Sequence, residues 1–174
     1  MSRIKKMMVA VDFSVYSVKI SKYARGIAGD LRAMLVFVHV INKRNIIAIR
    51  QAVPYYSKSL SAEDYIEKLK FESNEKMQKL IKETNCTNIN HKVVIRTGIP
   101  FIEVINSAEE EQVDLVIMGA RGRSDLAGIL FGSTAEKMFR HCPVPLLSIR
   151  GRDSHMSNEA LLQPLYVAPI IGTF

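Results

Sequence analysis

Short apolar runs alternate with stretches of helical periodicity up to about residue 150, and this alternation constrains the fold more than any other feature. Unbroken apolar strands joined by helices are typical of a parallel sheet that is buried on both faces. We therefore predict an α/β fold, with an open five-stranded parallel sheet and helices on both of its faces. The predicted strands are Met7–Phe13, Met34–Ile41, Val93–Ile95, Val113–Met118 and Val144–Ile149.

Between these runs, apolar residues recur at helical spacing and follow recognisable start signals. Residues Asn42–Leu60 fit neither pattern, because Pro54 and the short Ile46–Ile49 stretch suit an irregular insertion. The first helix is expected to end at Gly29-Asp30. Pro145 is costly inside a sheet, so the fifth strand is expected at a sheet edge or in a sheet-edge contact. The predicted helices begin near Tyr16, Ser61, Pro100 and Ser133.

Length and composition indicate one domain with a sizeable core, since the chain has 174 residues and is 48% hydrophobic. No apolar run approaches the ~20 residues that cross a bilayer. Asp12 interrupts the amino-terminal apolar run too early for the core of a signal peptide. We therefore expect a cytoplasmic protein that does not associate with membranes.

Charge and cysteine content argue against two other classes of function. The net charge is +7, but lysines alternate with glutamates from Glu63 to Glu83, as on a solvated helix face. Specific nucleic-acid binding is therefore not expected. Cys86 and Cys142 lie far apart in the sequence, form no metal-ligand pair and are expected to be buried thiols.

The strongest functional signal is a glycine pattern after the fourth predicted strand. Gly119 and Gly122 are followed, after nine residues, by Gly132 and Ser133. Glycines at a strand-to-helix turn let the backbone approach a ligand closely, and N–H groups at a helix start attract anions. The expected ligand is a phosphate group carried by a nucleotide.

A second candidate residue, Asp12, lies in the loop after the first predicted strand. Ligands of open parallel sheets bind beyond the carboxyl ends of the strands, where the strand order reverses. If the fourth strand lies beside the first, Asp12 and the glycine loop share one crevice. Asp12 can also cap the first helix, and the two roles are compatible.

The segments Val9–Ser14 and Val38–Val40, together with the pattern Gly-x2-Gly-x9-Gly-Ser, resemble the universal stress protein family over residues 3–150. The glycine spacing resembles the ATP-binding branch of that family. The resemblance implies the strand order 3-2-1-4-5 of the adenine nucleotide alpha hydrolase-like fold, and a homodimer formed through the fifth strand. It also implies ATP or AMP as the ligand, with Mg²⁺ as a candidate companion ion.

The resemblance further assigns a role to individual residues of the site. Asp12 is expected against the adenine and the ribose, with Val11 and Phe13 shaping the pocket. The backbone of Val40 is expected at the adenine edge. The remaining implied contacts are Met118 and Gly119 beside the adenine and ribose, and Gly122, Gly132, Ser133, Thr134 and Ala135 at the phosphates.

One departure from the family concerns Ala135, since members often carry a hydroxyl at this position. The hydroxyl of Thr134 lies one residue earlier and is expected to point about 100° away. One phosphate contact is therefore expected to be absent, so AMP or ADP would be retained as readily as ATP. Arg121 and Arg123 suit either a phosphate contact or solvent, and Asp125 is a lone carboxylate that could hold Mg²⁺.

Motifs for rapid catalysis are absent from the sequence. It contains no Gly-x4-Gly-Lys-Ser/Thr loop, no Gly-x-Gly-x2-Gly fingerprint and no His-Glu-x2-His helix. We expect slow ATP hydrolysis or none, and His39 is expected to be a satisfied buried histidine. The first hypothesis is a nucleotide-binding sensor or regulator of the stress response. The alternatives are a slow nucleotide hydrolase or transferase, and an interaction scaffold with a vestigial nucleotide site.

Residues 151–174 form an apolar tail outside the domain of residues 1–150. Pro164 and Pro169 oppose a helix there, and so much apolar surface is not expected to stay exposed. We predict that the tail docks in a groove of its own subunit or across a dimer partner. A disordered end is the alternative.

Overall fold

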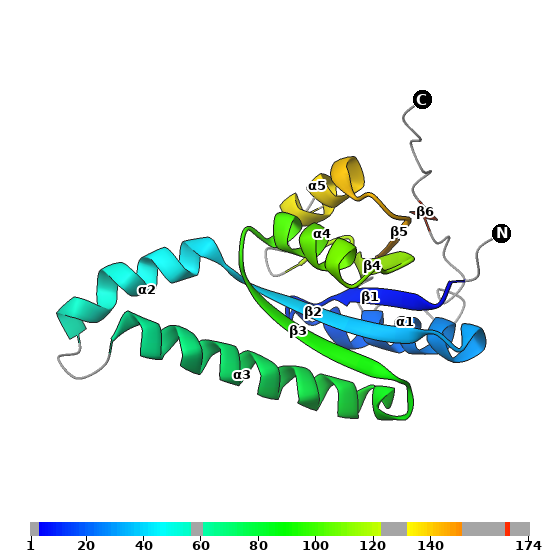
Figure 1. The fold of residues 1–174 in the computed structure, drawn as a ribbon, viewed down its shortest axis with the longest axis horizontal. Coiled ribbons are helices and arrows are strands. Elements are labelled where there is room, and N and C mark those ends of the chain that lie inside the picture. The colour runs from blue at the N-terminus through cyan, green and yellow to red at the C-terminus, as the bar shows by residue number, and fades with distance from the viewer. Residues whose placement is uncertain (1–3, 57–60, 123–131, 151–165, 168–174) are drawn as a thin grey trace, which may run out of the picture.

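The computed structural model describes residues 4–56, 61–122, 132–150 and 166–167. The predicted α/β architecture is confirmed: a central sheet lies between two helix layers (Figure 1). Its strand order is β3-β2-β1-β4-β5-β6, and the first five strands pair in parallel, in the predicted order 3-2-1-4-5. The strands are β1 (Lys6–Ala10), β2 (Met34–Asn42), β3 (His91–Gly98), β4 (Leu115–Gly119), β5 (Leu146–Ile149) and β6 (Tyr166–Val167).

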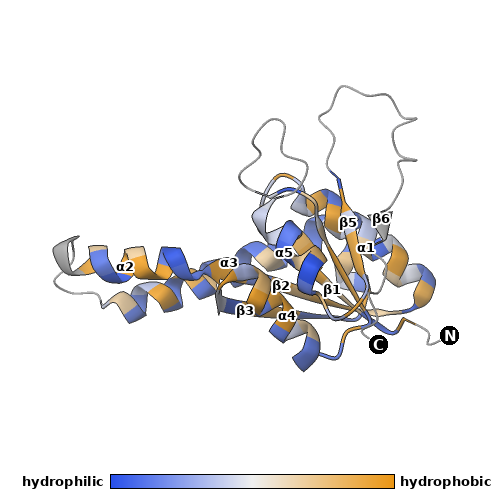
Figure 2. Cartoon of the chain, turned by 90° about the horizontal axis from the view of Figure 1, so that it is seen from above, coloured by the Kyte–Doolittle hydropathy of each residue, from blue (hydrophilic) through white to orange (hydrophobic). Residues whose placement is uncertain are grey.

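Each sheet face has its own apolar core, because successive strand residues point to opposite faces. Helices α1 (Ser17–Leu31) and α3 (Ala62–Glu83) cover one face, where Met7, Val9 and Phe37 are fully buried. Helices α4 (Pro100–Glu110) and α5 (Ser133–His141) cover the other face, over residues that include Met8, Val36 and Val116. Figure 2 shows the matching pattern of apolar strands and helices with mixed surfaces.

Local signals set most of the helix ends. A capping box begins α3 near the predicted start at Ser61: Asp64 N donates to Ser61 Oγ, and Ser61 N donates to Asp64 Oδ2, at 3.1 and 3.0 Å. Pro100 occupies the first turn of α4, as expected. The predicted stop of α1 at Gly29-Asp30 is wrong, because the helix continues to Leu31 and ends where Arg32 takes a left-handed conformation.

The irregular insertion predicted at Asn42–Leu60 is also wrong, because helix α2 (Lys43–Tyr56) forms there. Its apolar residue Ile46 packs with Ile41 and with Ile66 of α3. Pro54 lies in the last turn, so it removes a hydrogen bond near the helix end rather than in the middle. Helix α2 and the first turns of α3 form a pair that extends beyond the sheet (Figure 1), which we call the α2–α3 arm.

Strand β5 is the last of the parallel strands and begins at Leu146, so Pro145 lies just outside it. The expected edge position is not what the structure shows, because β5 pairs with β4 on one side and with β6 on the other. Of the tail, the structure describes only Tyr166–Val167, which form β6 and pair antiparallel with Leu147 and Ser148. A short 3₁₀ helix, η1 (Cys86–Asn88), connects α3 to β3. Within the described residues, no helix is long and apolar enough to cross a membrane.

Candidate functional site

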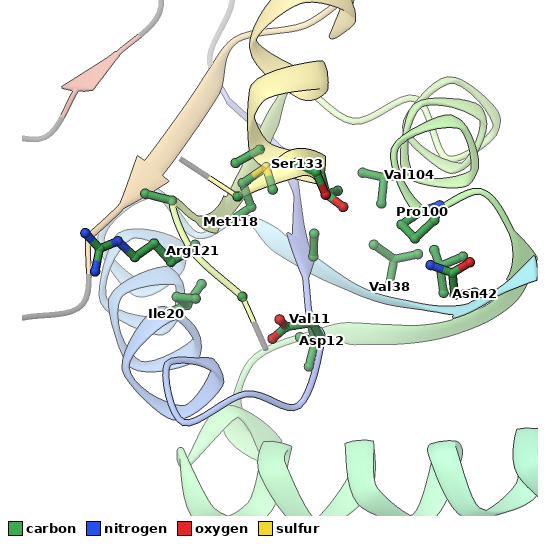
Figure 3. A pocket seen from close by; sticks show the side chains of 18 of the residues that line it. Val11, Asp12, Ile20, Val38, Asn42, Pro100, Val104, Met118, Arg121 and Ser133 are labelled. Carbon is green, nitrogen blue, oxygen red and sulfur yellow. The ribbon is translucent and has the colours of Figure 1, made fainter. Parts of the chain in front are cut away.

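A cavity of about 320 Å³ lies beyond the carboxyl ends of β1, β2 and β4, as the topology predicts for an open parallel sheet (Figure 3). The structure brings every predicted site residue except Phe13 to this cavity. Its walls come from four helices and three strands or the loops after them. The lining residues are Ala10, Val11, Asp12, Ile20, Val38, Val40, Asn42, Asn45, Pro100, Val104, Met118, Gly119, Ala120, Arg121, Gly122, Gly132, Ser133, Thr134 and Ala135.

One end of the cavity is formed by the loop after β4 and the start of α5, and we call it the glycine end. The helix begins at Ser133, and its cap residue Gly132 has no side chain that could accept a hydrogen bond. Gly132 N itself donates to Ala120 O at 2.8 Å. The N–H groups of Ser133, Thr134 and Ala135 therefore have no partner within the helix and are available at the cavity.

The three glycines of the pattern have different structural roles. A Cβ at Gly119 would lie 2.8 Å from Arg121 O and 2.9 Å from Ile20 Cδ1, so the turn leaves no room for a side chain. A Cβ at Gly122 would lie 2.5 Å from Asp12 Oδ2. At Gly132 the nearest atom would be 3.7 Å away, an ordinary contact. Gly119 is thus required by close approach of the backbone, a side chain at Gly122 would displace the Asp12 carboxylate, and Gly132 has space for a Cβ.

Asp12 joins the first loop to the glycine end. Its Oδ1 accepts hydrogen bonds from Ser14 N at 2.9 Å and from Ser17 Oγ at 3.3 Å, which ties the loop to the start of α1. Its Oδ2 lies against Gly122, beside the cavity. Asp12 does not cap α1, because the cap residue is Tyr16 and no side chain caps it. The carboxylate instead holds the loop before α1 with one oxygen and leaves the other at the cavity wall.

Phe13 does not line the cavity, so its predicted direct role in shaping the pocket is not what the structure shows. Its backbone is left-handed, with φ of 59°, and its ring lies 4.3 Å from the ring of His39. His39 is 4% exposed, and its Nδ1 lies 2.7 Å from Val11 O, to which it donates. The expectation of a buried, hydrogen-bonded histidine is confirmed. Because Phe13 directly follows Asp12, its ring contact with His39 supports the loop that carries Asp12.

The opposite end of the cavity is formed by the end of β2 with the starts of α2 and α4, and we call it the Asn42 end. In β2, Met34 N bonds to Lys5 O and Val38 O accepts from Val11 N, so even-numbered residues direct their backbone groups toward β1. Because β1 ends at Ala10, opposite Val38, the N–H and C=O of Val40 point past the last residue of β1.

Five residues at the Asn42 end were not predicted from the sequence, namely Val38, Asn42, Asn45, Pro100 and Val104. A usable signal was present for Asn42. Side chains alternate along a strand, so Asn42 shares a face with Val38 and Val40 once β2 is extended by one residue. The predicted strand ends at Ile41 and the next segment is predicted to be irregular, so Asn42 is not recognised from the sequence as a residue of the site.

The charged groups at the cavity are few. Arg121 is the one cation among the described lining residues, and Figure 3 shows its side chain extending away from the cavity. Asp12 is the one carboxylate in the same set. Arg123 and Asp125 lie outside the described residues. Among the residues that the structure describes, no cluster of three His, Cys, Asp or Glu side chains could hold a metal ion.

The two cysteines lie away from the cavity. Cys86 is fully buried beside Thr84, and burial raises the pKa of its thiol. Cys142 is half-buried against the core under α4 and α5, and burial raises the pKa of its thiol as well. Both are therefore poorer nucleophiles than free thiols, in agreement with a packing role.

Comparison with known proteins gives a consistent result over most of the chain. Residues 3–150 match the profile of the universal stress protein family. The chain is 29% identical over 157 residues to universal stress protein MJ0577 of Methanocaldococcus jannaschii, which covers 86% of this chain and 97% of that protein. The solved structure of MJ0577 superposes with a TM-score of 0.72 at 27% identity, over 88% of this chain and all of that one.

Two solved relatives were determined with bound nucleotides. A universal stress protein in complex with cAMP has a TM-score of 0.57 at 19% identity, covering 86% of this chain and 98% of that one. The universal stress protein from Archaeoglobus fulgidus in complex with dAMP has a TM-score of 0.57 at 16% identity, covering 84% and 98%. At these identities the likeness establishes the common fold.

Proposed function

Because the chain belongs to the universal stress protein family, we propose that it binds an adenine nucleotide, ATP or AMP, and acts as a nucleotide-dependent regulator of the stress response. The observation that carries the proposal is the start of α5, where three backbone N–H groups without helical partners face the cavity. Donors at a helix start, aligned with the helix dipole, suit a phosphate group.

The phosphate would lie at the glycine end. The donors there are the N–H groups of Ser133, Thr134 and Ala135, and the absence of side chains at Gly122 and Gly132 leaves room for phosphate oxygens. Gly132 would contribute space rather than a hydrogen bond, since its own N–H is bonded to Ala120 O. Backbone donors hold AMP and ATP alike, so they set no strong preference for the number of phosphates.

The base would lie at the Asn42 end, between apolar walls formed by Val38, Val104 and Met118. Val40 presents one N–H and one C=O side by side past the end of β1. This pair matches adenine, in which the N6 amino group donates and N1 accepts. Guanine presents the reverse order at the same edge, so adenine is favoured. Asp12 Oδ2, beside the cavity, would accept a hydrogen bond from a ribose hydroxyl.

The same cavity favours retention of nucleotide over rapid turnover. No described lining residue is a lysine, and Asp12 has no second carboxylate beside it in that set. Phosphoryl transfer depends on charge stabilisation and on a positioned nucleophile. The relatives solved with cAMP and dAMP carry adenine nucleotides and support the ligand class.

We also propose a homodimer in the cytoplasm, formed through the β5 edge, with the tail of residues 151–174 docked at or near it. β6 already pairs with β5 in one subunit, so the tail and a partner subunit would meet at the same strand. Removal of residues 151–174, followed by native mass determination, tests this assembly. A tail that docks on the β5 edge predicts a changed dimer population or a lowered melting temperature, and no change in either would contradict it.

Nucleotide binding is tested by isothermal titration calorimetry with ATP, AMP and GTP on the full chain. We expect saturable binding of ATP and AMP and weaker binding of GTP. Gly122→Val should abolish binding, because its side chain displaces Asp12 and enters the cavity. Gly29→Ala is the matched control, since nothing lies within 4 Å of its added Cβ. No heat and no thermal stabilisation at millimolar nucleotide would contradict the proposal.

A further inference from the structure

We propose that Asn42 couples base binding to helix α2: its amide nitrogen donates to a ring nitrogen of the bound purine, while its amide oxygen holds the start of the helix. The proposal rests on the proposed function, since it requires a base at the Asn42 end of the cavity. It adds a residue that contacts the base and an element that responds to occupancy.

The oxygen of Asn42 has a structural partner. Arg44 N donates to Asn42 Oδ1 at 3.0 Å, and α2 begins at Lys43, so the side chain caps the first turn of the helix. This bond also fixes the orientation of the amide, because the oxygen is held at the helix and the nitrogen occupies the other branch.

The nitrogen of Asn42 is not needed for capping. Capping requires an acceptor, and aspartate supplies it as well as asparagine does. Asn42 Nδ2 donates to none of the described residues, and the side chain lines the cavity near Pro100 (Figure 3). Asn42 is on the strand face that carries Val38 and Val40, and all three residues line the cavity. Unsubstituted ring nitrogens of adenine are acceptors, so a donor at this position complements the base.

Helix α2 is held by few contacts, which makes it sensitive to its first turn. Ile46 is its one buried apolar residue among those whose side chains are described, at 9% exposed, and Ile47 is 46% exposed. The helix packs on α3 at the edge of the fold, and none of its described residues belongs to the two main core clusters. A helix with so little burial unfolds locally more readily than the sheet does. A hydrogen bond between Asn42 and the base would therefore raise the fraction of molecules in which α2 is folded.

The coupling must act in both directions. If nucleotide stabilises the capped form of α2, then a capped α2 binds nucleotide more tightly by the same factor. The exposed face of the α2–α3 arm, with Ile47 and Tyr65, would then differ between the empty and occupied protein. A partner that binds this face of the α2–α3 arm could then distinguish the nucleotide-bound protein from the empty one without contacting the phosphates.

The test combines calorimetry with hydrogen–deuterium exchange of residues 43–56 in the full chain, with and without AMP. Asn42→Asp keeps the cap and removes the donor, and Asn42→Ala removes both. Asn106→Asp, on the exposed side of α4, is the control for the added charge. In the wild type, we expect AMP to slow exchange in α2 by about threefold or more.

The two variants should separate the two functions of the side chain. Asn42→Asp should bind AMP about tenfold more weakly, show wild-type exchange in α2 without nucleotide, and lose the protection by AMP. Asn42→Ala should also exchange faster in α2 without nucleotide. Wild-type affinity in Asn42→Asp, or no AMP-dependent protection of α2 in a wild type that binds AMP, would overturn the coupling alone. A wild type that binds no nucleotide would overturn the proposed function and the coupling with it.

Discussion

The two ends of the cavity are built in different ways. At the glycine end, Gly119 lies against the backbone oxygen of Arg121, and Gly122 lies against the carboxylate of Asp12. At the Asn42 end, side chains form the wall and one of the helices, α2, has a single buried apolar residue among its described side chains. A surface of backbone donors suits a phosphate, whose charge every nucleotide shares. A side-chain surface on a weakly held helix suits recognition and response.

The largest expected effect concerns the turn at the glycine end. Gly119→Val places atoms where Arg121 O and Ile20 Cδ1 already lie, so the backbone of the turn must shift. Overpacking of this kind costs about 1–3 kcal/mol and occasionally more, and we expect the upper part of that range. Thermal unfolding measures the loss, with Gly29→Ala as the control. A variant as stable as the wild type would contradict the close packing at this end.

The next largest effect concerns His39, which bonds to Val11 O and contacts the ring of Phe13 on either side of Asp12. His39→Leu removes the donor to Val11 O, and leaving a buried carbonyl without its partner costs about 1–3 kcal/mol. It also frees Phe13 to leave its left-handed conformation, so AMP should bind several-fold more weakly. Chemical denaturation and calorimetry measure the two effects. Loss of stability with unchanged affinity would show that the loop does not depend on His39 for binding.

A pair of alanine substitutions compares the glycines that differ in available space. In Gly122→Ala the added Cβ meets Asp12 Oδ2, so AMP affinity should fall by about tenfold, or about 1.4 kcal/mol. In Gly132→Ala the Cβ has ordinary contacts and the backbone conformation is extended, so stability should change by less than about 1 kcal/mol. Calorimetry and thermal unfolding of both variants measure the difference. Equal losses in the two would contradict the distinct roles assigned to them.

The smallest expected effect on stability concerns Asp114, which lies at the amino ends of β1 and β4, away from both ends of the cavity. Asp114 Oδ2 accepts from Lys5 N at 2.8 Å and from Lys6 N at 2.9 Å, and these backbone bonds lower the pKa of the carboxyl group. A lowered pKa in the folded state stabilises the protein above the ordinary carboxyl range, and the contribution is lost as the pH falls through the folded pKa. Because solvent screens this group, Asp114→Ala should cost less than about 1 kcal/mol at pH 7.

The pH dependence of that variant provides the check. The stability difference from the wild type should shrink as the pH falls below about 4, while AMP affinity at pH 7 stays unchanged. Denaturant unfolding at several pH values measures it. A difference that persists undiminished at pH 2, or that grows on acidification, would contradict the assigned hydrogen bonds.

The sequence allowed the strands and the glycine end to be predicted, because both depend on strong local signals. Apolar runs such as Met34–Ile41 identify buried strands, and glycines at fixed spacing identify a turn with close approach. The family resemblance then supplied the strand order, which determines the position of Asp12 opposite Gly122.

The Asn42 end could not be predicted in the same way. Ile46, Ile49 and Val53 recur at helical spacing in α2, but Pro54 made a helix look unfavourable although it falls in the last turn. Asn42 ends a strand and caps a helix at once, so neither pattern alone identifies it. Phe13 was assigned to the pocket wall because it follows Asp12, whereas its left-handed backbone turns it toward His39.

The most direct test of the account is a ¹⁵N chemical-shift titration of the wild-type protein with AMP and, separately, with adenosine. With AMP, we expect shifts at both ends of the cavity, in the amides of residues 133–135 and in those of Val40 and the first turn of α2. With adenosine, we expect shifts at the Asn42 end and little change at residues 133–135. Shifts at residues 133–135 that are as large with adenosine as with AMP, or no shifts at either end, would contradict the placement of phosphate and base.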